Sequence, residues 1–171
     1  MKLRYSLVFT LPLLSTSLIA ADLAVKVEVP RLKVAEYHRP YMALWLEKPD
    51  QSFVSNLAVS YDVKKKDNGG AKWLNDMRQW WRKSGRDLKT PIDGVTGATY
   101  APGEHTLSLN GVKPALQKLP AGEYQFVIEA AREAGGREVV RIPFTWPPKA
   151  AETPSAKGKE ELGSVTLLLK P

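Results

Sequence analysis

The sequence contains no cysteine and only two histidines, His38 and His105, among its 171 residues. The absence of cysteine excludes disulfides, thiolate metal sites, iron–sulfur clusters and thiol catalysis. Two histidines are too few for a histidine-rich metal site. An exported protein without disulfides must be stabilised by its core alone, which fits the bacterial periplasm better than a disulfide-dependent extracellular setting.

The usual signatures of catalysis and of nucleotide binding are also missing. There is no G-x-G-x-x-G, no P-loop and no G-x-S-x-G nucleophile elbow. Acidic residues are plentiful, but nothing in their spacing singles out a catalytic pair, so a hydrolase is the weakest alternative. His105 fits a turn cap or a strand start better than a metal ligand. We therefore favour a protein that is not an enzyme with its own substrate.

The chain has no long apolar run. Two basic residues precede a short apolar stretch that Pro12 and three hydroxyl residues interrupt. This pattern is typical of a secretory signal peptide, here residues 1–21 with cleavage near Ala20 or Ala21. No cysteine follows it, which excludes a lipoprotein anchor, and no transmembrane segment is expected in the mature chain. Residues 22–171 suffice for a single domain with its own core.

Positive charge is concentrated in one segment. The formal charge of +7 falls to +5 when the signal peptide is removed, and residues 62–89 hold nine Lys or Arg against four Asp. Nucleic acid is not an expected partner of an exported protein. A phosphorylated ligand, an acidic protein or an anionic membrane surface would suit the segment, and so would a role as an ordinary solvated surface.

Strand patterns dominate the mature chain. Residues 23–29 alternate apolar with polar side chains, as a half-buried strand does, and "AGG" at 134–136 predicts a hairpin turn. About eight strands without βαβ alternation predict a mainly β fold, an antiparallel β-sandwich that is immunoglobulin-like in broad shape. The further strands are expected at residues 41–48, 52–61, 104–111, 122–133, 137–146 and 164–171.

One amphipathic helix is expected at residues 71–86. Its apolar side chains recur with the helical period and form one face, and Gly85 is a suitable residue at which to stop. We expect Trp73, Met77 and either Trp80 or Trp81 to be buried against the sandwich, although a ligand nearby could stack on the rings of this face. The face consists of Trp73, Met77, Trp80 and Trp81.

The stretch "DGVTGATYAPG" surrounds one hydroxyl, that of Thr99, with small residues. It resembles the target motif D-x-x-T-G-A-T of ApbE-type FMN transferases, which take FMN from FAD and join its phosphate to a Thr or Ser hydroxyl. The resemblance implies that Thr99 is the acceptor. It also implies that Asp93, Thr96, Gly97 and Ala98 are recognition residues. Small side chains and a pliable backbone would let the acceptor enter another enzyme's active site.

A second resemblance covers residues 23–169. The stretches "HRPYMALWLEK", "RQWWRKSGRD" and "LPAGEYQFVIEAAREAGGREVVRIPF", together with the motif, are similar to a predicted periplasmic family called domain of unknown function 2271 (DUF2271). The resemblance implies a setting beside PepSY-type membrane reductases and flavin transferases.

The sequence therefore predicts a periplasmic electron carrier with FMN attached covalently to Thr99, flavinylated by an ApbE-type transferase and partnered by a PepSY-type membrane reductase. The alternative is a periplasmic binding module without a cofactor, in which the motif is a plain turn. From proximity in sequence, the candidates for stacking on the flavin or contacting its phosphate are Trp80, Trp81, Tyr100, Arg82 and Lys89.

Overall fold

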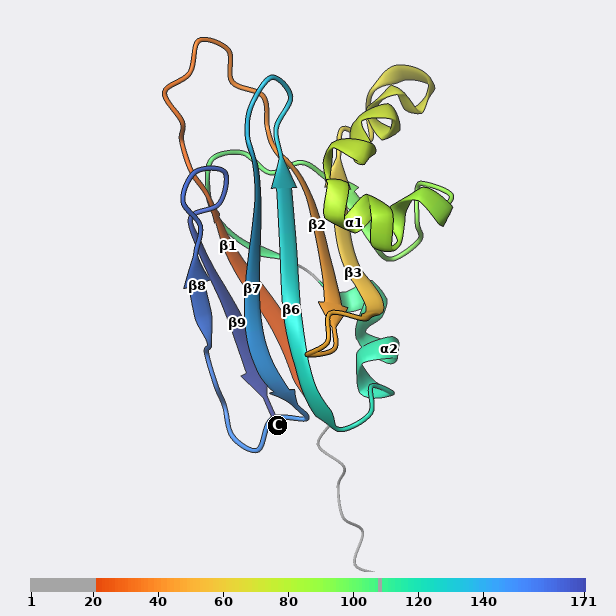
Figure 1. Cartoon of the computed structure of the whole chain (residues 1–171), viewed down its shortest axis with the longest axis vertical. Coiled ribbons are helices and arrows are strands. Elements are labelled where there is room, and N and C mark those ends of the chain that lie inside the picture. The colour runs from red at the N-terminus through yellow and green to blue at the C-terminus, as the bar shows by residue number, and fades with distance from the viewer. Residues whose placement is uncertain (1–20, 108) are drawn as a thin grey trace, which may run out of the picture.

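The computed structural model describes residues 21–107 and 109–171, so residues 1–20 of the expected signal peptide lie outside the described part of the chain. The described residues form nine strands in two sheets, packed face to face as a sandwich (Figure 1). The four-stranded sheet has the order β5 (Gly103–Leu107), β1 (Asp22–Val29), β9 (Ser164–Lys170) and β8 (Ser155–Lys157). The five-stranded sheet has the order β4 (Thr96–Ala98), β3 (Phe53–Tyr61), β2 (Tyr41–Glu47), β6 (Gly122–Ala131) and β7 (Arg137–Trp146).

The predicted mainly β sandwich is confirmed, with two refinements. Every strand pair is antiparallel except β3 with β4, which run parallel. The short strands β4 and β8 lie outside the ranges in which strands were expected, and the described residues contain nine strands.

The two sheets bury one apolar core between them. In β1, buried Val25 and Val27 alternate with the less buried Lys26 and Glu28, so the outer face of this sheet meets solvent. The outer face of the five-stranded sheet is instead covered, and β2 is buried on both faces over most of its length. This explains why "MALWL" is a continuous apolar run rather than an alternating one.

The cover on the outer face is helical but is not one helix. A 3₁₀ segment, η1 (Lys66–Asp76), is followed by α1 (Arg78–Lys83) and a short 3₁₀ turn, η2 (Gly85–Asp87). Figure 1 shows these turns beside β2 and β3, at the upper end of the sheet in this view. The expected α-helix at residues 71–86 is therefore wrong in its length and regularity.

The buried side chains of this segment agree with the expected face at Met77 and Trp80 and differ from it at Leu74 and Trp73. Leu74, Met77 and Trp80 are at most 1% exposed, and they are spaced by three residues, the period of a 3₁₀ helix. Trp73, which an α-helical period places on the buried face, is 43% exposed. Its predicted burial is wrong because the segment does not keep the 3.6-residue period. Gly85 lies under the Trp80 ring, where a Cβ atom would come within 2.5 Å of it.

A second helical segment replaces the end of an expected strand. β5 ends at Leu107, and η3 (Asn110–Val112) then leads into α2 (Lys113–Gln117). Val112 of η3 and Leu116 of α2 are buried. In the described part of the chain, no helix has the length and apolar character needed to cross a membrane.

Candidate functional site

The motif segment forms a turn followed by a short edge strand. The Ile92 N–H donates to the Thr96 hydroxyl oxygen at 2.8 Å, and the Thr96 N–H donates to the Ile92 carbonyl at 2.9 Å. These two bonds close the turn. β4 then pairs with β3, with Ala98 opposite Tyr61. Thr99 therefore follows directly after a strand at the edge of the sheet.

The fold requires a small residue at some positions of the motif and not at others. Gly94 has a φ of +67°, and a Cβ atom on it would lie 3.1 Å from the Gly111 Cα, so the fold itself requires glycine there. Gly97 has neither a positive φ nor any atom within 4 Å of where its Cβ would be. Asp93 and Ala98 are exposed. The fold therefore explains Gly94 and does not explain the missing side chain of Gly97.

Thr99 lines a cleft of about 330 Å³ that is partly open to solvent. The cleft collects side chains from the connection between β1 and β2, from the start of β2, from the stretch after β3 and from the β6–β7 hairpin. We call it the Thr99 cleft. It is lined by Tyr37, His38, Arg39, Tyr41, Asp62, Lys65, Thr99 and Glu133.

Arg39 and Lys65 are two exposed cations of the Thr99 cleft without partners in the described part of the chain. Among the described residues, neither an ion pair nor a side-chain hydrogen bond involves the side chains of Arg39 or Lys65. His38 lies between two carboxylates, with its Nε2 3.3 Å from Glu36 Oε1 and its Nδ1 3.8 Å from Glu133 Oε2. Two cationic side chains are therefore available to an anion entering the cleft.

The tyrosines supply aromatic surface to the cleft. The Tyr37 hydroxyl is buried and has no hydrogen-bond partner among the described residues. Burial raises the pKa of Tyr37 and likewise that of Tyr41. The Tyr41 ring packs edge-on against Tyr61, with centroids 6.2 Å apart. Tyr37 therefore lines the cleft while its hydroxyl lies inside the protein, where Arg132 and Glu161 are the charges that act on it most.

The residues that were expected to stack on a flavin or contact its phosphate lie elsewhere. Trp80 is fully buried, and its indole N–H donates to Asn56 Oδ1 at 2.8 Å. Tyr100 packs against His105, with ring centroids 5.0 Å apart, and against the core between the sheets. Trp81 packs on Trp80, while Arg82 and Lys89 are exposed. None of the five expected residues lines the Thr99 cleft.

One stretch of the sequence could have pointed to residues that line the Thr99 cleft. "YHRPY" at residues 37–41 places two tyrosines, a histidine and an arginine next to one another just before a buried strand. Such a combination is common at ligand sites, where aromatic faces and cations act together. His105 Nε2, in contrast, donates a hydrogen bond to the Ala101 carbonyl oxygen at 2.7 Å, in keeping with its predicted place at a strand start.

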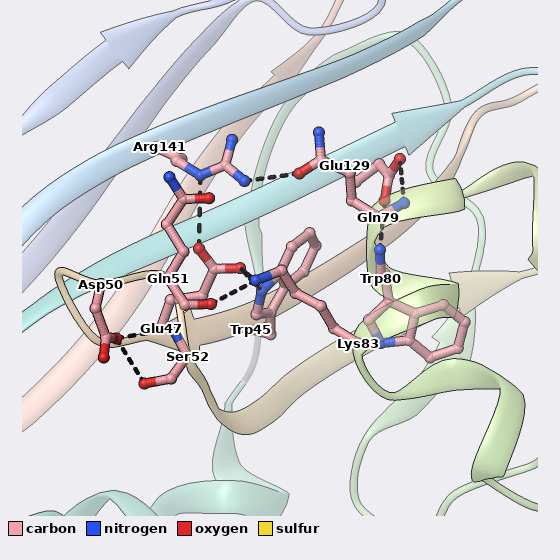
Figure 2. Close-up of polar contacts among 10 residues, drawn as sticks. All are labelled: Trp45, Glu47, Asp50, Gln51, Ser52, Gln79, Trp80, Lys83, Glu129 and Arg141. Carbon is pink, nitrogen blue, oxygen red and sulfur yellow. Dashed lines mark hydrogen bonds and ion pairs between the residues drawn. The ribbon is translucent and has the colours of Figure 1, made fainter.

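A second group of aromatic and charged side chains lies under α1 and joins it to the sheet (Figure 2). Glu129, fully buried on β6, accepts hydrogen bonds from the backbone N–H groups of Gln79 and Trp80 at 3.1 and 2.8 Å. Arg137 neutralises this carboxylate at 3.0 Å. Glu129 therefore satisfies free N–H groups at the start of α1 and holds the helix on the sheet.

Glu47 on β2 contacts the other end of α1 through the side chain of Lys83. Its Oε1 accepts from the Trp45 indole N–H at 2.8 Å and lies 2.9 Å from Lys83 Nζ, and its Oε2 faces Arg141 Nε at 3.6 Å. Arg141 also donates to Gln79 Oε1 at 2.7 Å (Figure 2). We call this group the helix clamp. It consists of Trp45, Glu47, Gln79, Trp80, Lys83, Glu129, Arg137 and Arg141.

No group of three or more described His, Asp or Glu side chains is arranged to hold a metal ion. No curated protein and no solved structure matches the chain. The profile of one protein family, described as "Predicted periplasmic protein (DUF2271)", matches residues 22–164, which is most of the domain expected after signal cleavage. The chain therefore belongs to the DUF2271 family of predicted periplasmic proteins.

Proposed function

We propose that this protein is a periplasmic electron carrier that holds FMN as a phosphoester on Thr99. The observation that carries the proposal is that the acceptor position of the motif lines a cleft that also holds two tyrosines and two cations without described ion pairs. An FMN group carries a phosphate, hydroxyl groups and a flat ring system, and these residue types suit all three. The volume of about 330 Å³ is at the lower end for a small-molecule site, so part of the ring would face solvent.

The attachment step needs FAD and an ApbE-type transferase. The Thr99 oxygen forms a bond to the phosphorus of the FMN half of FAD, the pyrophosphate bond breaks and AMP leaves. The hydroxyl proton passes to a base of the transferase or to water. The protein's own contribution is to present Thr99 after an edge strand, beside Gly97, whose open side leaves room for a second protein to approach.

After attachment, the chain's residues position the group and control its surroundings. Arg39 and Lys65 can neutralise the phosphodiester, and the tyrosine rings can shield one part of the ring system from water. The flavin supplies the redox chemistry. A covalent tether also prevents loss of the cofactor outside the cytoplasm. The resemblance to systems with PepSY-type membrane reductases suggests such a reductase as the electron partner.

The test is the intact mass of the protein exported from a host that also produces the flavin transferase. We expect wild type to carry an FMN adduct that maps to Thr99 and is absent in Thr99→Ala. Thr96→Ala should reduce labelling without abolishing it, because the Thr96 hydroxyl holds the turn through Ile92. Thr153→Ala, at an exposed threonine outside the motif, is the matched control. Unmodified wild type would overturn the proposal in favour of a binding module without a cofactor.

A further inference from the structure

The Thr99 cleft has features that a simple attachment point does not need. A tether requires only an accessible hydroxyl at the end of a pliable segment. Here the hydroxyl lies among residues from four separate parts of the chain, including Tyr37, Arg39 and Glu133. The fold brings these side chains together at one end of the five-stranded sheet, which points to recognition of a ligand and not only to tethering.

The charges of the cleft are arranged for a ligand of mixed character. Arg39 and Lys65 provide two cations without described partners, and Asp62 and Glu133 provide two carboxylates. The Asp62 carboxylate accepts from the Lys64 backbone N–H at 3.2 Å, which leaves it further capacity as an acceptor. A ligand with a phosphate and several hydroxyl groups matches this set, because the phosphate pairs with the cations while hydroxyl groups donate to the carboxylates.

Tyr37 contributes its residue surface to the cleft and not its hydroxyl. The hydroxyl oxygen is buried, and the charged groups that act on it most are Arg132 and Glu161, which form a buried ion pair. A ligand in the cleft therefore meets the charged side chains of Arg39 and Lys65 beside an aromatic wall.

We propose that the Thr99 cleft is a phosphate-directed flavin site that binds FMN without the covalent bond. Arg39 and Lys65 bind the phosphate, and Tyr37 and Tyr41 line the wall beside it. The cleft thereby orients the flavin once it is attached to Thr99. This inference rests on the proposed function for the identity of the ligand, but binding by the cleft is separable from attachment.

The experiment uses wild-type protein produced without the flavin transferase, so that no ester forms. Free FMN is titrated and its fluorescence quenching and anisotropy are measured, with riboflavin as the analogue that lacks the phosphate. We expect FMN to bind at least about 10-fold more tightly than riboflavin, which corresponds to one charge-assisted contact. Inorganic phosphate should compete with FMN and not with riboflavin.

Variants of the cleft locate the site. Arg39→Met and Lys65→Met should each weaken FMN binding by about 10-fold and leave riboflavin binding unchanged. Tyr37→Phe should leave both FMN binding and the unfolding midpoint unchanged, because the hydroxyl is buried and has no described partner to lose. Lys149→Met, at an exposed lysine outside the cleft, is the matched control and should bind FMN as wild type does.

The outcomes separate this inference from the proposed function. Equal affinity for FMN and riboflavin, no binding of FMN, or FMN binding that ignores both Arg39→Met and Lys65→Met would overturn the cleft site. If an adduct nevertheless forms on Thr99, the proposed attachment stands and the cleft is not its recognition site. Phosphate-dependent FMN binding together with an unmodified Thr99 after co-production would overturn covalent attachment and support the cleft site.

Discussion

The helix clamp and the Thr99 cleft both combine aromatic rings with cations and carboxylates on the five-stranded sheet, yet they use them differently. In the helix clamp, the Trp80 and Trp45 indoles and the Glu129 carboxylate all have hydrogen-bond partners. In the Thr99 cleft, neither Arg39 nor Lys65 has a described ion pair. Residue types alone therefore do not distinguish a structural network from a ligand site, whereas the pairing of their polar atoms does.

Two atoms of the helix clamp lack hydrogen bonds, and they illustrate the same point. Glu47 Oε2 and Arg141 Nε are both buried without a hydrogen-bond partner, but they face each other at 3.6 Å with opposite charges. Each of them is thus compensated electrostatically inside the protein. The buried Tyr37 hydroxyl likewise lies in the field of Arg132 and Glu161, so the groups that remain for a ligand are the exposed cations Arg39 and Lys65.

The largest effect on stability is expected from Trp80→Ala. The side chain is fully buried between α1 and the sheet, and truncation leaves a cavity and an unpaired Asn56 amide. We expect the free energy of unfolding to fall by about 3–5 kcal/mol, measured by urea denaturation. An unchanged urea midpoint would show that α1 is not docked on the sheet. The helix clamp would then not be a structural network, and it would no longer differ from the Thr99 cleft.

A smaller loss is expected from Glu129→Gln. The amide keeps the shape of the side chain and one acceptor oxygen, but it loses the charge that pairs with Arg137 and strengthens the bonds from the start of α1. The free energy of unfolding should fall by about 1.5–3 kcal/mol. FMN binding, measured on the same protein, should stay at the wild-type level. Weaker flavin binding at unchanged stability would move Glu129 from the clamp to the ligand site.

The contribution of Glu138, another carboxylate with hydrogen-bond partners, to the stability of the fold should depend on pH. Burial raises the pKa of Glu138, but hydrogen bonds from the backbone N–H groups of Lys159, Glu160, Leu162 and Glu161 outweigh it and hold the pKa below the ordinary value of 4.5. A lowered folded pKa means that the carboxylate stabilises the fold above pH 4.5 and that this contribution is lost as pH falls through the folded pKa.

The test compares the unfolding free energies of wild type and Glu138→Gln across this range. The difference should be largest near neutral pH and should shrink on acidification below pH 4.5. Parallel stability curves for the two proteins would contradict the assignment. No comparable loss is expected from Glu133→Gln in the Thr99 cleft, because its only described partner is His38 at 3.8 Å.

The sequence predicted the local parts of this fold and missed those that depend on distant contacts. The alternation in residues 23–29 and the turn at 134–136 follow from nearest neighbours, and both were predicted correctly. The helical segment was misjudged because its 3₁₀ geometry, with left-handed Asp67 and Asn68 at its start, has no clear sequence signal. β4 was missed because its pairing with β3 is parallel and long-range.

The candidate site shows the same limit. The motif around Thr99 could be recognised from the sequence, and its acceptor role stays a prediction. Its surroundings were sought among residues close in the chain, such as Trp80 and Arg82, whereas the cleft is lined by residues from positions 37 and 133. Only the folded sheet brings these positions together.

A small effect on stability is expected from Trp73→Ala, which is the counterpart of Trp80→Ala in the same segment. Trp73 is 43% exposed and projects from η1 outside the buried face of that segment. The free energy of unfolding should change by no more than about 0.5 kcal/mol. A loss comparable to that of Trp80→Ala would show that the segment has the regular α-helical period in solution.

Some residues of the basic segment 62–89 belong to the helix clamp and others line the Thr99 cleft. Lys83 belongs to the helix clamp and lies 2.9 Å from the buried Glu47, so its reversal would damage the fold. Lys65 lines the Thr99 cleft. The remaining lysines near the cleft are exposed and have no described ion pairs, which makes them suitable for testing long-range electrostatics alone.

The smallest effect on stability, and a separate effect on rate, is expected from reversing Lys64, Lys66 and Lys72 to Glu. These side chains are exposed, so the fold should be unchanged by circular dichroism and urea denaturation. If the segment steers an anionic or acidic partner toward Thr99, flavin attachment or flavin reduction should be slower at low salt. The difference from wild type should shrink at high salt, because surface charges are screened over about 8–10 Å.

Timed flavin labelling and stopped-flow reduction across a salt series would measure this effect. The matched control reverses three exposed lysines outside the basic segment, Lys118, Lys149 and Lys170, and so changes the net charge by the same amount. Steering by the basic segment requires the first triple variant to be slower than the control at low salt and equal to it at high salt. Equal rates for both variants at every salt concentration would show that only net charge matters, and the segment would then be an ordinary solvated surface next to the Thr99 cleft.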